Sequence, residues 1–236
     1  FGAIYGLRYK GVYAYSYDQF DKAQASGATC PVARDEAGGI IYGANGDPMP
    51  MYYDYNGTKY AFTGGDAIYE DVNHDGSIDQ YDVVYLGSSL PKLTGGFGFR
   101  LFYKGWSLNA QFNYRYGNKI ANVARMMAEN MHGADNQSTA VNYRWRKEGD
   151  MTEIPRALYQ YGYNYLGSDR FVEDGSFLRL NYLQLSYGFD SKLVKRIGLS
   201  RLNLYVSGEN LFCLTKYSGV DPEVNYGSMG VTKDEA

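Results

Sequence analysis

The sequence of 236 residues has no run of eighteen apolar residues, which excludes a transmembrane helix. Membrane-spanning β-strands have a much weaker hydropathy signal, so the mean hydropathy of -0.45 does not exclude them. Only 2 cysteines are present, Cys30 and Cys213, and we expect unlinked thiols because two distant cysteines make no disulfide framework. The net charge of -3 argues against a general nucleic-acid binder.

Residue patterns for catalysis are also scarce. The 2 histidines, His74 and His132, lie in no zinc-binding or Ser/His/Asp pattern. Glu173 and Asp174 are adjacent, and adjacent strand residues face opposite ways, so we interpret Asp174 as the start of a turn. The segment 118–170 mixes Arg, Tyr and Trp, which suits ligand contact and plain loop packing equally. We therefore predict that the protein is not an enzyme.

Tyrosine is abundant. The chain contains 26 Tyr, which with 11 Phe and 2 Trp makes it 17% aromatic. Because tyrosine has an apolar ring and a polar tip, such a surplus suits surfaces between water and an apolar medium, including membrane-interface girdles and surfaces that contact carbohydrate or peptide.

Residues 106–116 alternate without exception between apolar and polar side chains. One face would carry Trp106, Leu108, Ala110, Phe112, Tyr114 and Tyr116, and the other Ser107, Asn109, Gln111, Asn113 and Arg115. This period of two is typical of a β-strand and does not fit a helix. In a soluble sandwich the apolar face points into a core, whereas in a lipid-embedded barrel it points outward and the polar face lines a wet interior.

We predict five strands, at about 1–12, 93–104, 106–117, 173–189 and 199–212. Eleven residues extend about 36 Å and, tilted by about 45°, span about 25 Å, the height of an outer-membrane apolar band. An Arg at the bilayer midplane costs about 2–4 kcal/mol, so Arg100 and Arg115 should face the lumen.

Two of these strands raise particular expectations. In the first strand Leu7 should share the outward face with Phe1, Ala3, Tyr5 and Tyr9. In the strand at 173–189 the apolar parity changes near Asn181, so either a β-bulge shifts the register or the upper part leaves the lipid and packs on loops.

The connections alternate in length along the chain. Long segments are expected at about 13–92, 118–172 and 213–236, and short turns at about 104–105 and 190–198. Outer-membrane barrels have this arrangement, with long loops outside the cell and short periplasmic turns. The sequence therefore predicts an all-β fold, the antiparallel strands of a transmembrane β-barrel.

The first long segment contains a calcium-loop pattern, "DVNHDGSIDQYD". Oxygen-bearing side chains stand at Asp71, Asn73, Asp75, Ser77, Asp79 and Asp82, with Gly76 at the sixth of twelve positions. Asp82 replaces the usual closing Glu, which shortens the arm and lowers the expected affinity. The flanking residues read as extended, and the alternative is an Asx-rich turn in a solvated loop. We expect bound Ca²⁺ to order the loop rather than to assist catalysis.

Three blocks in this order resemble the C-terminal part of SusC/RagA-type TonB-dependent outer-membrane transporters. They are "GDAIYEDVNHDGSIDQYDVVYLGSSLPKLTGGFGFRLFYKGWSLNAQFNYRYGN", "SDRFVEDGSFLRLNYLQLSYGF" and "IGLSRLNLYVSGENLFCLTKYSGVDPEV". The resemblance implies a plugged barrel of about 22 strands in the outer membrane of bacteria of the Bacteroides group (Bacteroidota), of which residues 1–236 supply about five strands. It also implies a SusD-like surface lipoprotein as lid, a TonB complex as energy source, and import of oligosaccharides, glycans or peptides.

Two other functions stay open at this point. The calcium loop and the tyrosine content also suit a secreted, calcium-stabilised β-domain that binds glycans, and a barrel without a plug is a passive porin. An open five-stranded sheet has two unpaired edges and is not stable by itself. With no initiator Met or leader at the start, we expect the chain to be part of a longer polypeptide.

Overall fold

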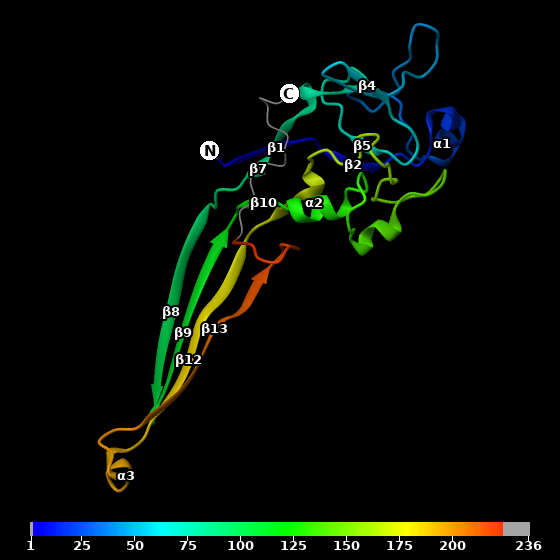
Figure 1. Ribbon diagram of the computed structural model, residues 1–236. Helices are drawn as coiled ribbons and strands as arrows, with labels where there is room; N and C mark the ends of the chain where they lie inside the picture. Colours follow the sequence, from blue (N-terminus) through cyan, green and yellow to red (C-terminus); the bar gives the residue numbers. More distant parts are fainter. Residues whose placement is uncertain (1, 224–236) are drawn as a thin grey trace.

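The computed structural model describes residues 2–223 as a long four-stranded sheet with a loop-rich body at one end (Figure 1). The sheet is antiparallel in the order β13-β12-β9-β8. Its strands are β8 (Leu93–Tyr103), β9 (Trp106–Tyr116), β12 (Phe177–Gly188) and β13 (Asn203–Thr215). These confirm four of the predicted strands, the last displaced by a few residues toward the C-terminus.

The two short connections lie together at one end of the sheet, which we name the turn end (Figure 1). Lys104 and Gly105 join β8 to β9 with φ angles of 44° and 87°, the positive values of a two-residue hairpin turn. Residues 189–202 join β12 to β13 and contain the short helix α3 (Ser191–Lys195). The turns contact each other through the Gly188 amide, which donates to the Gly105 carbonyl over 2.8 Å. These two short connections flank the longer segment between β9 and β12. The predicted long tail from 213 extends beyond the described residues.

The opposite end carries the loop body, residues 2–92 and 118–176. Its strands are β1 (Ala3–Gly6), β2 (Tyr9–Val12), β3 (Tyr52–Tyr55), β4 (Thr58–Ala61), β5 (Ala67–Tyr69), β6 (Ser77–Ile78), β7 (Val84–Ser88), β10 (Lys119–Ala121) and β11 (Val172–Asp174). Its helices are α1 (Phe20–Ser26), α2 (Val123–Glu129) and the 3-10 turns η1 (Tyr17–Gln19), η2 (Gln80–Asp82), η3 (Thr139–Tyr143) and η4 (Asp169–Phe171). No helix within residues 2–223 is long and apolar enough to cross a membrane.

The predicted spanning strand at 1–12 is wrong. The chain there forms two short strands, β1 and β2, which pair with β7 and β5 in the loop body. Leu7, expected on an outward face, is 4% exposed and packs in the core of the loop body, while Phe1 lies outside the described residues. The period of two was present, but alternation does not tell a lipid-facing side chain from one that packs on other loops.

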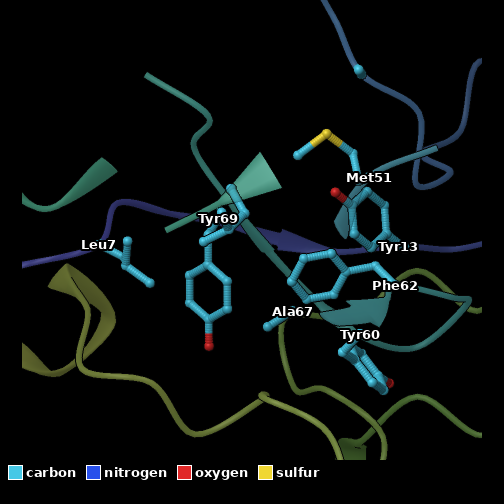
Figure 2. Close-up of a cluster of buried hydrophobic side chains, with 9 residues drawn as sticks. Leu7, Tyr13, Met51, Tyr60, Phe62, Ala67 and Tyr69 are labelled. Atoms are coloured by element: carbon cyan, nitrogen blue, oxygen red, sulfur yellow. The ribbon is translucent and has the colours of Figure 1, made fainter. Parts of the chain in front are cut away.

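Both long segments build the core of the loop body. Buried members Leu7, Tyr13, Met51, Tyr60, Phe62, Ala67 and Tyr69 come from the first segment (Figure 2). The second segment packs against them, with Tyr163 stacked on Tyr53 at a centroid distance of 3.8 Å. Many of the tyrosines therefore pack the two long segments against each other.

A β-bulge in β12 explains the change of parity near Asn181. Leu180 pairs with Phe112 and Tyr182 with Gln111, so Asn181 is an extra residue opposite β9. The bulge brings Leu178 and Leu180 onto the same face of the sheet as Leu183 and Leu185. Of the two explanations offered by the sequence, the bulge is confirmed.

Candidate functional site

One face of the four-stranded sheet is apolar and uncovered in the described structure. Register pairing places on it Phe97, Phe99, Leu101, Leu108, Phe112, Leu178, Leu180, Leu185, Leu204, Val206, Phe212 and Leu214. Leu101 and Val206 are 57% and 67% exposed, and the partly buried Phe112 is shielded by its neighbour Phe97, stacked at 5.0 Å. An apolar surface this continuous is rare on a soluble monomer and typical of a binding or membrane surface. Phe112 and Leu108 therefore do not lie in a closed interior.

The other face is mainly polar. Ser107 and Ser186 share a hydrogen bond of 2.6 Å between their hydroxyl oxygens, and the Tyr182 hydroxyl donates to Gln184 over 2.9 Å. By register, Arg100 pairs with Asn109 and Arg115 with Phe177 on this face, together with Arg179. Arg100 and Arg115 thus lie opposite the apolar face, as their predicted orientation toward a lumen requires.

A strap of residues 216–223 crosses the polar face near the loop body. Arg179 donates to Asp221 over 2.6 Å and lies 3.3 Å from Glu223, which also accepts a hydrogen bond from Asn113 over 3.1 Å. The hydrogen bond from Arg179 lowers the pKa of Asp221. The Ser218 amide donates to Glu173 over 2.7 Å. The strap thus occupies the polar side of the sheet and leaves the apolar side free.

Aromatic rings mark both ends of the apolar face. At the turn end Trp106 lies 4.8 Å from Tyr187, and the exposed Tyr103 pairs with Trp106 across the hairpin. At the end toward the loop body the same face carries Tyr114 and the exposed Tyr116. Two aromatic rows that bound an apolar band are the arrangement of an outer-membrane barrel wall.

The calcium-loop pattern forms a tight turn between β5 and β7, both extended as predicted. Asp71 accepts hydrogen bonds from the amides of Gly76 (2.8 Å) and Asp75 (3.3 Å). Gly76 has a φ of 82°, a left-handed conformation that strains residues with a Cβ and therefore favours glycine. The Asp75 carboxylate accepts from the Ser77 amide over 2.8 Å and the Asn73 side chain over 2.8 Å.

The last two carboxylates close the loop. Asp82 has no exposed surface, and its carboxylate accepts hydrogen bonds from the amides of Val72 (2.7 Å) and Asp79 (2.9 Å). Burial raises the pKa of Asp82 to about 6 and also raises the pKa of Asp71. Asp79 accepts from the Tyr81 amide over 2.7 Å and so caps the 3-10 turn η2.

The oxygen atoms of this loop are of the chemical type that Ca²⁺ binds. Carboxylate, amide and hydroxyl oxygens are the hard ligands that Ca²⁺ takes, and a carboxylate with two N–H donors still has free lone pairs. Within residues 2–223, however, no three Asp, Glu, His or Cys side chains are gathered into a cage. The loop presents the backbone shape and donor types of the pattern, but its carboxylates do not converge.

The remaining candidate residues have structural contacts. Glu173 accepts from Arg125 over 3.2 Å, and Asp174 accepts from Ser176, so the two do not form a carboxylate pair. The Trp145 indole of the segment 118–170 donates to a backbone carbonyl of the first segment, which is loop packing. Cys30 and Cys213 are free thiols, as expected.

Sequence reasoning did not find an aromatic pocket of about 460 Å³ in the loop body. It is lined by Thr58, Lys59, Tyr60, Ala61, His132, Gln160, Tyr161, Gly162, Tyr163 and Tyr165. Tyr161 is exposed, and the buried Nδ1 of His132 has no hydrogen-bond partner within the described residues. The lining residues come from three separate stretches of the sequence, which a single sequence does not show to be close together. The repeated tyrosines at 161, 163 and 165 are the signal that could have indicated the pocket.

Comparison with known proteins gives a consistent set of relatives, although no protein-family profile matches the sequence. TonB-dependent receptors P3 and P39 of Formosa agariphila are 29% and 30% identical over 95% and 94% of this chain. The TonB-dependent receptor SusC of Bacteroides thetaiotaomicron is 28% identical over 79%. The chain covers 19%, 22% and 17% of these proteins, about a fifth of their length.

Solved structures show the same fold. The RagAB peptide transporter superposes on 94% of the chain with a TM-score of 0.57 and 22% identity, and the chain covers 20% of that structure. These relatives are named as receptors and transporters, not enzymes, in agreement with the prediction. The chain therefore belongs to the TonB-dependent receptors of the SusC/RagA type.

Proposed function

We propose that this chain forms part of the wall of an outer-membrane importer that takes up oligosaccharides, glycans or peptides. The observation that carries the proposal is the sheet with two unlike faces, one apolar and uncovered, the other polar and bearing Arg100, Arg115 and Arg179. In water the apolar face has no partner, whereas in a bilayer it contacts hydrocarbon and the arginines border an aqueous or plugged bore. In a secreted domain this apolar face would be exposed to water, so the face favours the membrane protein over the secreted domain.

The position of the loops supports a division of roles. All long described segments lie at one end of the sheet and the short turns lie at the other. In outer-membrane barrels the long loops are extracellular and the short turns are periplasmic, which supports the same orientation here. The loop body is then placed to meet substrate and a SusD-like lipoprotein lid. A plug and a TonB-contacting segment belong to other parts of the whole polypeptide.

The aromatic pocket supports the proposed substrate classes. The tyrosine rings, Gln160, Lys59 and His132 offer both apolar faces and hydrogen-bonding groups, which sugar rings and peptide side chains both use. The described lining contains no acidic residue, so a cationic ligand is not favoured.

An uptake experiment tests the proposal. The gene for the whole protein is deleted from its host, and growth is followed on oligosaccharides and on peptides too large for porins. We expect one class to be lost and regained with the intact gene, but not in a strain without TonB. Uptake that is independent of TonB contradicts the proposal, as does a protein found in the soluble fraction that migrates identically on gels with and without heating.

We also propose that the loop at Asp71–Asp82 binds Ca²⁺ weakly, through oxygens of Asp71, Asn73, Asp75, Ser77, Asp79 and Asp82. What supports this is the twelve-residue spacing together with the left-handed Gly76 that Asp71 holds in place. Calorimetry of the whole protein should show binding in the micromolar to millimolar range that Asp75→Asn weakens, whereas Asp54→Asn, in an exposed pair with Lys59, leaves it unchanged. No heat at millimolar Ca²⁺ contradicts the proposal.

A further inference from the structure

The turn end of the sheet is strongly basic in a protein that is acidic overall. Its two connections, residues 104–105 and 189–202, contain Lys104, Lys192, Lys195, Arg196 and Arg201 and a single acid, Asp190. Their net charge is +4, and since the whole chain carries -3, the other residues together carry -7. Charge is therefore segregated along the length of the sheet.

These cations are available to a partner outside the chain. Among residues 2–223, no ion pair involves any of the five. Asp190 instead accepts from the Lys192 amide and caps helix α3. Lys104 lies over the ring of Tyr103 with its ammonium nitrogen 5.2 Å from the centroid.

Exposed apolar side chains stand among the same cations. Leu193, Ile197 and Leu199 are 59%, 67% and 45% exposed, while their neighbour Val194 is buried and holds the connection together. Side chains of this kind at the rim of an apolar band, next to Trp106 and Tyr187, suit the boundary between hydrocarbon and headgroups.

We propose that the turn end binds anionic phospholipid headgroups of the periplasmic leaflet of the outer membrane, with the basic side chains on the phosphates and Leu193, Ile197 and Leu199 in the acyl boundary. This inference rests on the proposed function, because it needs the sheet to cross that membrane with its turns on the periplasmic side. Charge complementarity and continuity with the uncovered apolar face favour lipid as the occupant. The strands place the cations where the headgroups lie.

The test uses the whole receptor, purified from outer membranes and titrated with phosphatidylglycerol or phosphatidylcholine while bound lipid is counted by native mass spectrometry. We expect phosphatidylglycerol to be preferred. The variant K192Q/K195Q/R196Q/R201Q should lose that preference, with a drop on the order of tenfold in affinity, because each cation near an anionic surface adds to the attraction. The control K22Q/K92Q/K119Q/K147Q makes the same change of charge at the loop end and should keep the preference for phosphatidylglycerol.

Three results separate the possible failures. Unchanged lipid preference in the basic-residue variant overturns this inference. A photo-crosslinker at Ile197 that captures a periplasmic protein and no lipid also overturns it. If the unmodified receptor is absent from the outer-membrane fraction, the proposed function has failed as well, whereas normal insertion with no lipid preference affects only this inference.

Discussion

The Asp66 carboxylate joins the two long segments of the loop body. It has no exposed surface and accepts hydrogen bonds from the Tyr60 hydroxyl (2.7 Å) and from Arg156 (2.7 Å) and Asn164 (3.3 Å) of the second segment. Breaking a buried pair by removing one partner leaves the other charge without compensation. The association of the segments therefore depends strongly on this one side chain.

We predict that Asp66→Ala destabilises the loop body by about 3–5 kcal/mol, the usual cost of breaking a buried ion pair. The measurement is the rate at which a protease cuts the loops of the whole protein in detergent, which should rise strongly while the strands stay protected. Asp54→Ala is the matched control: its pair with Lys59 is exposed and 3.9 Å long, so the change should stay within about 0.5 kcal/mol. Equal cutting rates for both variants would contradict the assigned role of Asp66.

At the residue scale, the sequence predicted interactions between near neighbours better than contacts between residues far apart in the chain. The residues of the calcium-loop pattern form a local turn, because hydrogen bonds such as that from the Gly76 amide to Asp71 join near neighbours. The network around Asp66 joins residues about 90 positions apart, and no spacing in a single sequence marks such a pair. The aromatic pocket was missed for the same reason.

At the scale of the element, the β12 bulge keeps one face of the strand apolar. We predict that deleting Asn181 and Tyr182 together turns Leu178 and Leu180 to the polar face and Arg179 to the apolar face, because Leu180 then directly precedes Leu183 and adjacent strand residues point to opposite faces. An arginine on the lipid face costs up to about 2–4 kcal/mol, less near the interface. The amount of folded barrel in the outer membrane, read from unheated gels, should fall.

Deleting Asn181 alone is the matched control, because Leu180 and Tyr182 then become neighbours that still pair with the adjacent residues Phe112 and Gln111, and both faces keep their side chains. The barrel of this control should assemble normally, since the bulge residue pairs with neither β9 nor β13 in the ladder. Normal assembly of the variant that lacks both Asn181 and Tyr182 would show that the register above the bulge is not fixed by the faces of the sheet.

The strap should respond to pH only in acid. Since the Arg179 hydrogen bond lowers the pKa of Asp221, the contact stabilises the strap above the unfolded value of about 3.9 and is lost as pH falls through the lower folded value. We predict that a spin label at Val220, in a Cys213→Ser background, stays immobile from about pH 8 to pH 5 and becomes mobile below about pH 4. Arg179→Met should free the label throughout, and a transition near neutrality would contradict the assignment.

The same comparison explains which elements the sequence predicted. Strands β8 and β9 were found almost to the residue because their alternation is unbroken and a two-residue turn fixes their register. The stretch at 1–12 alternates as well, yet it forms β1 and β2, since its pairing partners β7 and β5 lie about 60 to 80 residues away. Periodicity reports the two faces of a strand but not the medium that each face meets.

For the whole molecule, the decisive property is which face of the sheet meets lipid. The neighbours Gln111 and Phe112 lie near the middle of β9 and point to opposite faces, so they form an internal control. We predict that Phe112→Arg places a charge in hydrocarbon at a cost of about 2–4 kcal/mol, whereas Gln111→Arg adds one more cation to a polar face and costs little.

The two variants are compared in the whole protein by the fraction that resists unfolding on unheated gels and by denaturant titration of the purified barrel. Phe112→Arg should lower both, and Gln111→Arg should match the unmodified protein. The opposite ranking would mean that Gln111 and the arginines face lipid, and the sheet would then not be the wall of an aqueous bore. Equal stability of both variants would place the sheet outside the membrane, because only hydrocarbon on one side makes these adjacent positions unequal to this degree.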